Sequence, residues 1–379
     1  MSGIYIHIPF CKQACHYCNF HFSTSLKNRK EMIQAIVKEL DLRQDYLSDK
    51  NLSSVYFGGG TPSLLDEAEL NALFEAIHRH FHILPGAEIT LEANPDDLNP
   101  EKLQALRRSP VNRLSIGIQS FSDEDLRFMN RAHNAQEALK CLDLAREAGF
   151  DDLSVDLIYA APSTSNEQWK KNLQIVFDRA IPHLSCYCLT VEAGTALHHF
   201  IKKGSAPPVD EEKAVWQLEY LMEASEQAGY EQYEISNFAR QQRYARHNTA
   251  YWQNKPYLGI GPSAHSYNGH SRQWNKANNA HYRKALLADN AAEQYLQLIE
   301  VEQLTDGQRY NEYIMTGLRT MWGVSLETIQ QQFPDFEISF LEKMQAYLLS
   351  GEAVAQDGRY RLSKKGRFLA DHIAMELFG

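Results

Sequence analysis

Long apolar segments are absent from the sequence, and cysteines are few. No stretch approaches the roughly 18 uninterrupted apolar residues that a membrane-spanning helix requires. The N-terminus lacks the basic, apolar and small-residue regions of a signal peptide, so we expect a cytoplasmic protein. Six cysteines among 379 residues are too few for a disulfide scaffold. Ordinary core positions are expected for three of them, Cys141, Cys186 and Cys188.

Basic residues are outnumbered by acidic ones. There are 38 Lys and Arg against 48 Asp and Glu, which gives a formal net charge of -10. Since binding to a phosphate backbone depends on a basic surface, a nucleic-acid partner is not expected. With 44% hydrophobic residues, the chain can bury one large core and a smaller second domain.

Three cysteines stand close together after an alternating, strand-like run. Cys11, Cys15 and Cys18 have the spacing C-x-x-x-C-x-x-C. Three thiolates on one loop can bind three corners of a 4Fe-4S cluster and leave one iron open, whereas a closed cluster or a structural zinc takes a fourth protein ligand. Two other interpretations are open at this point: a redox pair in the C-x-x-C part, or a zinc site completed by His16 or His21.

A glycine-rich turn, residues 58–62, follows the next predicted strand at 54–57. Glycine lets a backbone approach a ligand closely and adopt dihedral angles that other residues avoid. A glycine triplet one strand after such a cysteine triad resembles the radical S-adenosylmethionine (SAM) superfamily. In that superfamily an aromatic residue precedes the last cysteine, and Tyr17 occupies this place here.

Strand-like segments alternate with stretches of helical periodicity. Strands are expected near 4–8, 54–57, 88–92, 113–117, 152–158 and 183–190. This alternation predicts a parallel sheet with helices outside it, an α/β fold. The resemblance implies the six-unit partial (β/α) barrel of the superfamily over residues 1–235. Active sites of such barrels lie at the C-terminal strand ends, where Glu92, Gln119 and Asp156 fall.

The pattern changes after residue 235. An irregular connecting segment is expected over 236–304, with a second glycine-rich stretch at 259–266 along the open side of the barrel. Residues 305–379 are expected to form a small α+β, winged-helix-like domain with a hairpin. They carry ten acidic and eight basic side chains, so a packing or lid role is favoured over DNA binding.

Within the superfamily, the chain resembles the oxygen-independent coproporphyrinogen III oxidase group over nearly its whole length. The resemblance implies a 4Fe-4S cluster on Cys11, Cys15 and Cys18. It implies contacts to the SAM at the cluster from Tyr5, Gly59 and Glu92. It implies contacts to a second SAM from Tyr17, Gly60, Thr61, Gln119, Arg131 and Asp156. In the family, the reduced cluster cleaves SAM to give methionine and a 5′-deoxyadenosyl radical.

Two departures separate the chain from the oxidase pattern. Phe20 stands where the oxidase has a fourth cysteine, and the long segment that precedes the first oxidase strand has almost no counterpart. Both fit the branch of the group regarded as haem chaperones, which also carries a His-Asn-x-x-Tyr-Trp motif, here residues 247–252. The resemblance implies a protein that binds haem and delivers it to an acceptor, a membrane-associated respiratory protein. The alternative function is oxidative decarboxylation of coproporphyrinogen III, and a third possible function is a zinc or thiol redox module. The sequence is also compatible with a homodimer.

The His-Asn-x-x-Tyr-Trp motif also has a direct chemical interpretation. A neutral imidazole is a good axial ligand for haem iron, and aromatic rings supply apolar contact area for a porphyrin face. His247 beside Tyr251 and Trp252 is therefore the haem candidate, and His265 is the second candidate ligand. The competing interpretation is that His247 forms local hydrogen bonds while the aromatic rings pack into the core.

Overall fold

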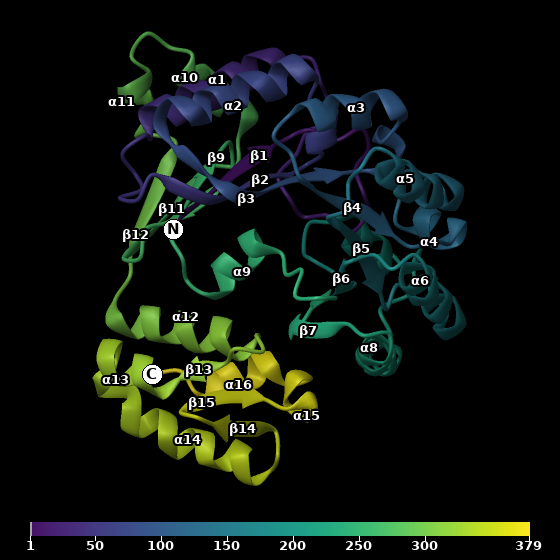
Figure 1. The fold of residues 1–379 in the computed structure, drawn as a ribbon, viewed down its shortest axis with the longest axis vertical. Helices are drawn as coiled ribbons and strands as arrows, with labels where there is room; N and C mark the ends of the chain where they lie inside the picture. Colours follow the sequence, from purple (N-terminus) through teal and green to yellow (C-terminus); the bar gives the residue numbers. More distant parts are fainter. Residues whose placement is uncertain (1) are drawn as a thin grey trace.

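The computed structural model describes residues 2–379 and contains a large and a small body (Figure 1). A sheet of 12 strands runs through the large body, and a separate sheet of three strands lies in the small one. Among the described residues, no helix is both long and apolar enough to cross a membrane.

Six parallel strands form the centre of the large sheet and follow one another in chain order. They are β1 (Ser2–Ile8), β2 (Asn51–Gly59), β3 (His82–Ala93), β4 (Arg113–Gln119), β5 (Leu153–Tyr159) and β6 (His183–Cys188). Ile4 lies opposite Val55, and Asp156 lies opposite Ser185, so the C-terminal strand ends share one edge. The predicted six-unit parallel sheet is confirmed.

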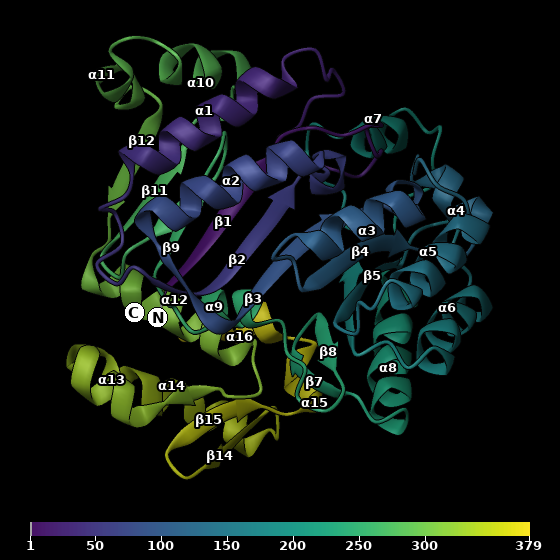
Figure 2. The ribbon, with the colours of Figure 1, turned by 45° about the horizontal axis from the view of Figure 1, so that its top comes forward.

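Helices follow these strands along the chain and pack mainly on the outer face of the sheet; the first six lie between consecutive strands, and the last two come after β6. They are α1 (Arg29–Leu42), α2 (Glu67–His80), α3 (Pro100–Arg108), α4 (Asp123–Phe128), α5 (Ala135–Glu147), α6 (Asn166–Asp178), α7 (Ala196–Lys202) and α8 (Glu211–Gln227). Figure 2 shows α1, α2 and α3 along the outer face. Asp66 and Asn134 begin α2 and α5 with a capping box each, which supplies partners for N–H groups that the first turn leaves unpaired.

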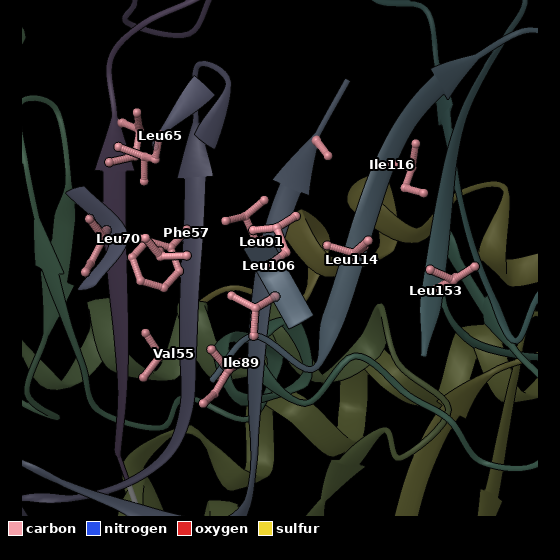
Figure 3. Packing of buried hydrophobic residues seen from close by; sticks show 14 of the residues in the cluster. Val55, Phe57, Leu65, Leu70, Ile89, Leu91, Leu106, Leu114, Ile116 and Leu153 are labelled. Atoms are coloured by element: carbon pink, nitrogen blue, oxygen red, sulfur yellow. The ribbon is translucent and has the colours of Figure 1, made fainter. Parts of the chain in front are cut away.

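The core lies between the strands and this helical layer. In β1, Ile4, Ile6 and Ile8 are fully buried in the core, whereas Tyr5 and His7 alternate with them and point to the opposite face. Burial of each such aliphatic side chain stabilises the fold by about 1.5–3 kcal/mol. Figure 3 shows the continuation of this core over β2 to β5, with Val55, Phe57, Leu65, Leu70, Ile89, Leu91, Leu106, Leu114, Ile116 and Leu153. The outer face is thus the packed one, and the inner face is left for polar side chains.

Residues 236–304 are more regular than the sequence predicts, and part of this segment extends the large sheet beyond β1. After β7 (Glu231–Glu234), the elements are β8 (Asn237–Ala239), α9 (Arg246–Trp252), β9 (Tyr257–Ile260), β10 (His265–Tyr267), β11 (Ser271–Asn275), α10 (Asn279–Leu286), α11 (Ala291–Tyr295) and β12 (Ile299–Gln303). β9 pairs with β1 in parallel, and the three later strands continue antiparallel. The glycine-rich stretch packs two strands together, because a Cβ on Gly259 would lie 1.9 Å from the carbonyl oxygen of His265.

The small body contains a core of its own. Its elements are α12 (Asp306–Leu318), β13 (Val324–Ser325), α13 (Leu326–Gln332), α14 (Glu337–Leu349), β14 (Ala353–Gln356), β15 (Arg359–Leu362), α15 (Lys364–Arg367) and α16 (Ala370–Glu376). Tyr310, Ile314, Phe340, Met344 and Ile373 are buried in this second core. The predicted small domain with a hairpin is confirmed, while the boundaries proposed at 235/236 and 304/305 stay predictions.

Candidate functional site

A cavity of about 810 Å³ lies at the C-terminal ends of the six parallel strands. The structure brings most of the predicted cluster and SAM residues to its wall. These are Cys11, Cys15, Tyr17, Cys18, Gly59, Gly60, Thr61, Glu92, Gln119, Arg131 and Asp156. Tyr5 is the exception, because it lies behind the wall, with its hydroxyl 3.1 Å from Nδ1 of His7 and its ring against that of Tyr56. The binding roles of these residues stay predictions.

The three cysteines of the loop are free and half-buried. Burial raises the pKa of the Cys11 thiol to about 11, and burial also raises the pKa of Cys18. The Arg131 guanidinium donates to Sγ of Cys15 at 3.3 Å and is held by Asn94 Oδ1 at 2.7 Å. Thiols that burial keeps protonated become thiolates when a metal supplies positive charge. Three free thiols on one cavity wall, beside a fixed cation, therefore fit a 4Fe-4S cluster with three protein ligands.

The zinc alternative finds less support in the side-chain geometry. Within residues 2–379, no group of three or more His, Cys, Asp or Glu side chains is arranged around a single metal position. His16 Nδ1 contacts the Phe128 carbonyl at 2.9 Å, and His21 Nε2 contacts Asn279 Oδ1 at 2.7 Å. A cluster, in contrast to zinc, takes one cysteine per iron, so its thiolates need not converge on one point.

The glycine turn after β2 requires its glycines. Gly59 has a φ of +103°, and a Cβ on it would lie 2.4 Å from Nδ1 of His7. A Cβ on Gly60 would lie 2.5 Å from the carbonyl oxygen of Phe10. The Gly60 N–H donates to the Ile8 carbonyl at 2.9 Å. The turn is thus packed against the start of the cysteine loop, and Gly59 and Gly60 line the cavity.

Two half-buried carboxylates, Glu92 and Asp156, line the cavity, and within residues 2–379 neither forms an ion pair. Glu92 accepts from the Tyr56 hydroxyl at 2.8 Å and from the Gly59 N–H at 3.1 Å, and burial raises its pKa to about 7. Asp156 accepts from the Ser115 hydroxyl at 3.2 Å, and burial raises its pKa to about 6. Since a buried carboxylate is costly unless it is paired, an amino group or a pair of ribose hydroxyls would stabilise this arrangement.

Gln119 ends β4 in the left-handed region, with a φ of +65°. It is buried and lines the cavity. A non-glycine residue held in this region carries backbone strain, and such strain is concentrated at binding sites. The conformation directs the chain abruptly away from the strand at the cavity edge.

The His-Asn-x-x-Tyr-Trp motif forms α9, but its histidine is not an open ligand. His247 is 1% exposed, with Nδ1 2.8 Å from the Ser54 hydroxyl and Nε2 2.8 Å from the Tyr251 hydroxyl. Its ring stacks on Tyr56, and burial lowers its pKa to about 3. The Glu88 carboxylate accepts from the His247 N–H at 3.0 Å and so anchors the first turn. Both ring nitrogens are hydrogen-bonded, so one of these bonds would have to break for His247 to bind iron, and its role as an axial ligand stays a prediction.

Two further haem candidates, Trp252 and His265, do not line the cavity. Trp252 is half-buried, with the Arg319 guanidinium 5.2 Å above its ring. His265 is exposed on β10 and stacks on the Trp274 ring at 5.7 Å. Of the six motif residues, Asn248 is the one that lines the cavity.

Sequence reasoning missed the opposite wall of the cavity. Cys188 was expected to be a core thiol, but it is half-buried and lines the cavity at the end of β6. The small body contributes Arg319 and the segment from Arg367 to His372. No sequence pattern marks these residues, because their place depends on how the small body packs against the barrel.

Known proteins resemble this chain along its whole length. The radical SAM superfamily model matches residues 5–176, and the HemN C-terminal domain model matches residues 304–369. The heme chaperone HemW of Bacillus subtilis is 33% identical over 339 residues, covering 88% of this chain and 87% of the relative. The heme chaperone HemW of Mycobacterium tuberculosis strain H37Rv is 31% identical over 381 residues, covering 100% of this chain and 95% of the relative.

A solved structure shares the fold. Coproporphyrinogen III oxidase (HemN) from Escherichia coli, described as a radical SAM enzyme, superposes with a TM-score of 0.84 at 25% identity. The superposition covers 100% of this chain and 89% of the oxidase. The likeness supports the predicted fold class of a partial barrel with a small C-terminal domain.

Proposed function

We propose that this chain, which belongs to the HemW family of radical SAM proteins, is a haem chaperone that binds haem and transfers it to an acceptor protein. The observation that carries the proposal is its similarity to proteins named heme chaperone HemW over nearly the whole chain. Phe20 agrees with it, since this residue is 67% exposed at the cavity and occupies the place of the fourth oxidase cysteine.

For the cluster, we propose the thiolates of Cys11, Cys15 and Cys18 as ligands, with Arg131 offsetting their negative charge. When bound, such a cluster supplies an electron and an open iron to SAM. Gly59 lines the cavity where this SAM would lie, and its N–H holds the Glu92 carboxylate, which lines the same cavity. Tyr5 acts indirectly, because its ring orients Tyr56, which donates to Glu92.

For a second SAM, we propose the remaining residues of the same cavity: Tyr17, Gly60, Thr61, Gln119, Arg131 and Asp156. Asp156 would accept from ribose hydroxyls or an amino group of such a ligand. We propose that SAM contributes to haem transfer by changing how the small body packs against the cavity. Arg319 supports this proposal, since this residue of the small body binds Glu234 of the large body at 3.1 Å and is also held by Asp371 of its own body at 2.7 Å.

We further propose a cytoplasmic location and a membrane-associated respiratory haem protein as the acceptor. An iron-sulfur cluster with an open iron requires a reducing compartment, and the cytoplasm provides one. The acceptor follows from the family resemblance and not from a surface of this chain.

The alternative function is oxidative decarboxylation of coproporphyrinogen III. The observation in its favour is the superposition on coproporphyrinogen III oxidase, which covers 100% of this chain and 89% of the oxidase. The two functions are distinguished with anaerobically reconstituted protein, by titrating haemin and by assaying protoporphyrinogen formation from coproporphyrinogen with SAM. The proposal expects a saturable change of the Soret band and no protoporphyrinogen, against an active oxidase as control. No haem binding above that of an unrelated acidic protein would contradict it.

A further inference from the structure

The cavity extends past the proposed SAM residues to a wall that belongs to the small body. The segment from Arg367 to His372 and Arg319 form this wall. None of these residues belongs to the proposed cluster or SAM sets. The total volume of about 810 Å³ is near the upper end of the 300–1,000 Å³ range of small-molecule sites.

The two guanidinium groups on this wall differ in how their charge is compensated. Arg319 forms ion pairs with Glu234 and Asp371. Arg367 is half-buried, and its side chain donates to a neutral amide, Oε1 of Gln232, at 2.7 Å. Within residues 2–379, Arg367 forms no ion pair with a carboxylate, and Lys364 binds the nearby Glu226. Arg367 is thus a partly desolvated cation without a direct ion-pair partner, and the one carboxylate that acts on it from a distance, Glu226, is bound by Lys364.

Apolar side chains line part of the cavity that Arg367 also lines. Phe368 and Leu369 follow it, and Leu189, Leu218 and Ile235 line the same cavity. A ligand that complements both the apolar side chains and the Arg367 cation has an apolar body and an anionic group. A planar guanidinium binds a carboxylate with two parallel hydrogen bonds, which makes a carboxylate the natural partner.

We propose that Arg367 binds a propionate carboxylate of haem, so that haem lies in this cavity between the cysteine loop and the small body. The inference rests on the proposed haem-chaperone function and names its binding site. It differs from the His247 site, whose ring nitrogens are both hydrogen-bonded. The apolar side chains contact the porphyrin face, while Arg367 fixes its carboxylate edge.

The experiment titrates anaerobically reconstituted full-length protein with haemin and with haemin dimethyl ester, in which both carboxylates are blocked. We compare wild type with Arg367→Gln, Arg367→Lys and a matched control, Arg359→Gln, in the same domain but outside the cavity. Arg367→Gln is expected to weaken haemin binding about ten- to hundredfold, as loss of a charged hydrogen bond does. It should leave binding of the dimethyl ester unchanged. Arg367→Lys should recover part of the affinity, and Arg359→Gln should behave as wild type.

Two outcomes would overturn the inference while leaving the proposed function intact: unchanged haemin affinity in Arg367→Gln, or equal weakening of haemin and its ester. A fall in SAM affinity with unaltered haemin affinity would also overturn it, because the carboxylate bound would then be that of SAM. Absence of saturable haemin binding by the wild type would instead refute the proposed function itself. Circular dichroism and the cluster absorbance of each variant report whether the fold is retained.

Discussion

Burial of His247 should make the protein lose stability in mild acid. The ordinary imidazole pKa is 6.5, and burial lowers that of His247 to about 3. Below pH 6.5 the unfolded ring takes up a proton, whereas the folded ring stays neutral until the pH nears 3. The contribution of this residue to the free energy of unfolding is therefore complete above pH 6.5 and falls by about 1.4 kcal/mol per pH unit below it. Between pH 7.5 and 5.5 the loss from this ring is about 1.4 kcal/mol.

Urea unfolding of wild type and His247→Gln at both pH values, followed by circular dichroism, measures this contribution. The variant should lose about 1.4 kcal/mol less than wild type on acidification. At pH 7.5 it should be less stable by about 2–4 kcal/mol, since Ser54 and Tyr251 lose hydrogen-bond partners in the core. His281→Gln, on the exposed face of α10, is the matched control and should keep the wild-type pH dependence. An equal pH dependence in wild type and His247→Gln would refute the argument that the buried ring stays neutral.

Further predictions concern the cysteine loop, the glycine turn and the contact between the two bodies. Cys18→Ser should abolish the absorbance near 400 nm of the reconstituted protein, whereas Cys188→Ser should keep it, because only the first belongs to the proposed cluster triad. Gly59→Ala should reduce SAM affinity in calorimetric titrations by more than tenfold, because the added Cβ would overlap the buried imidazole of His7. Gly86→Ala is the control: its Cβ would meet no atom within 4 Å, and this variant should bind SAM as the wild type does. Arg319→Ala should destabilise the protein by about 3 kcal/mol in urea unfolding, because the buried Glu234 carboxylate loses its cationic partner. Unchanged stability would show that the Arg319–Glu234 ion pair does not hold the two bodies together.

The parallel sheet and most of its cavity residues were predictable from local sequence patterns. Each strand is a short apolar run followed by a helical stretch, and parallel strands bring their C-terminal ends to one edge. Glu92, Gln119 and Asp156 could therefore be assigned to one site although they are far apart in the sequence.

The parts that could not be predicted depend on long-range packing. β9 pairs with β1 across more than 250 residues, and β10 has only three residues, so no periodicity marks these strands. The environment of His247 is set by Ser54 and Glu88, which come from two other strands. Arg367 reaches the cavity only through the docking of the small body, which local patterns do not encode.

Transfer of haem to an acceptor tests the central claim most directly. The protein is reconstituted with its cluster, loaded with haemin, freed of unbound haemin and mixed with haem-depleted membranes that contain a respiratory haem protein. The account predicts that the respiratory activity returns as the Soret band of the chaperone declines. An unrelated acidic protein that carries the same amount of haemin should restore much less. Haem that stays on the protein, or equal recovery with the unrelated carrier, would contradict the assignment as a haem chaperone.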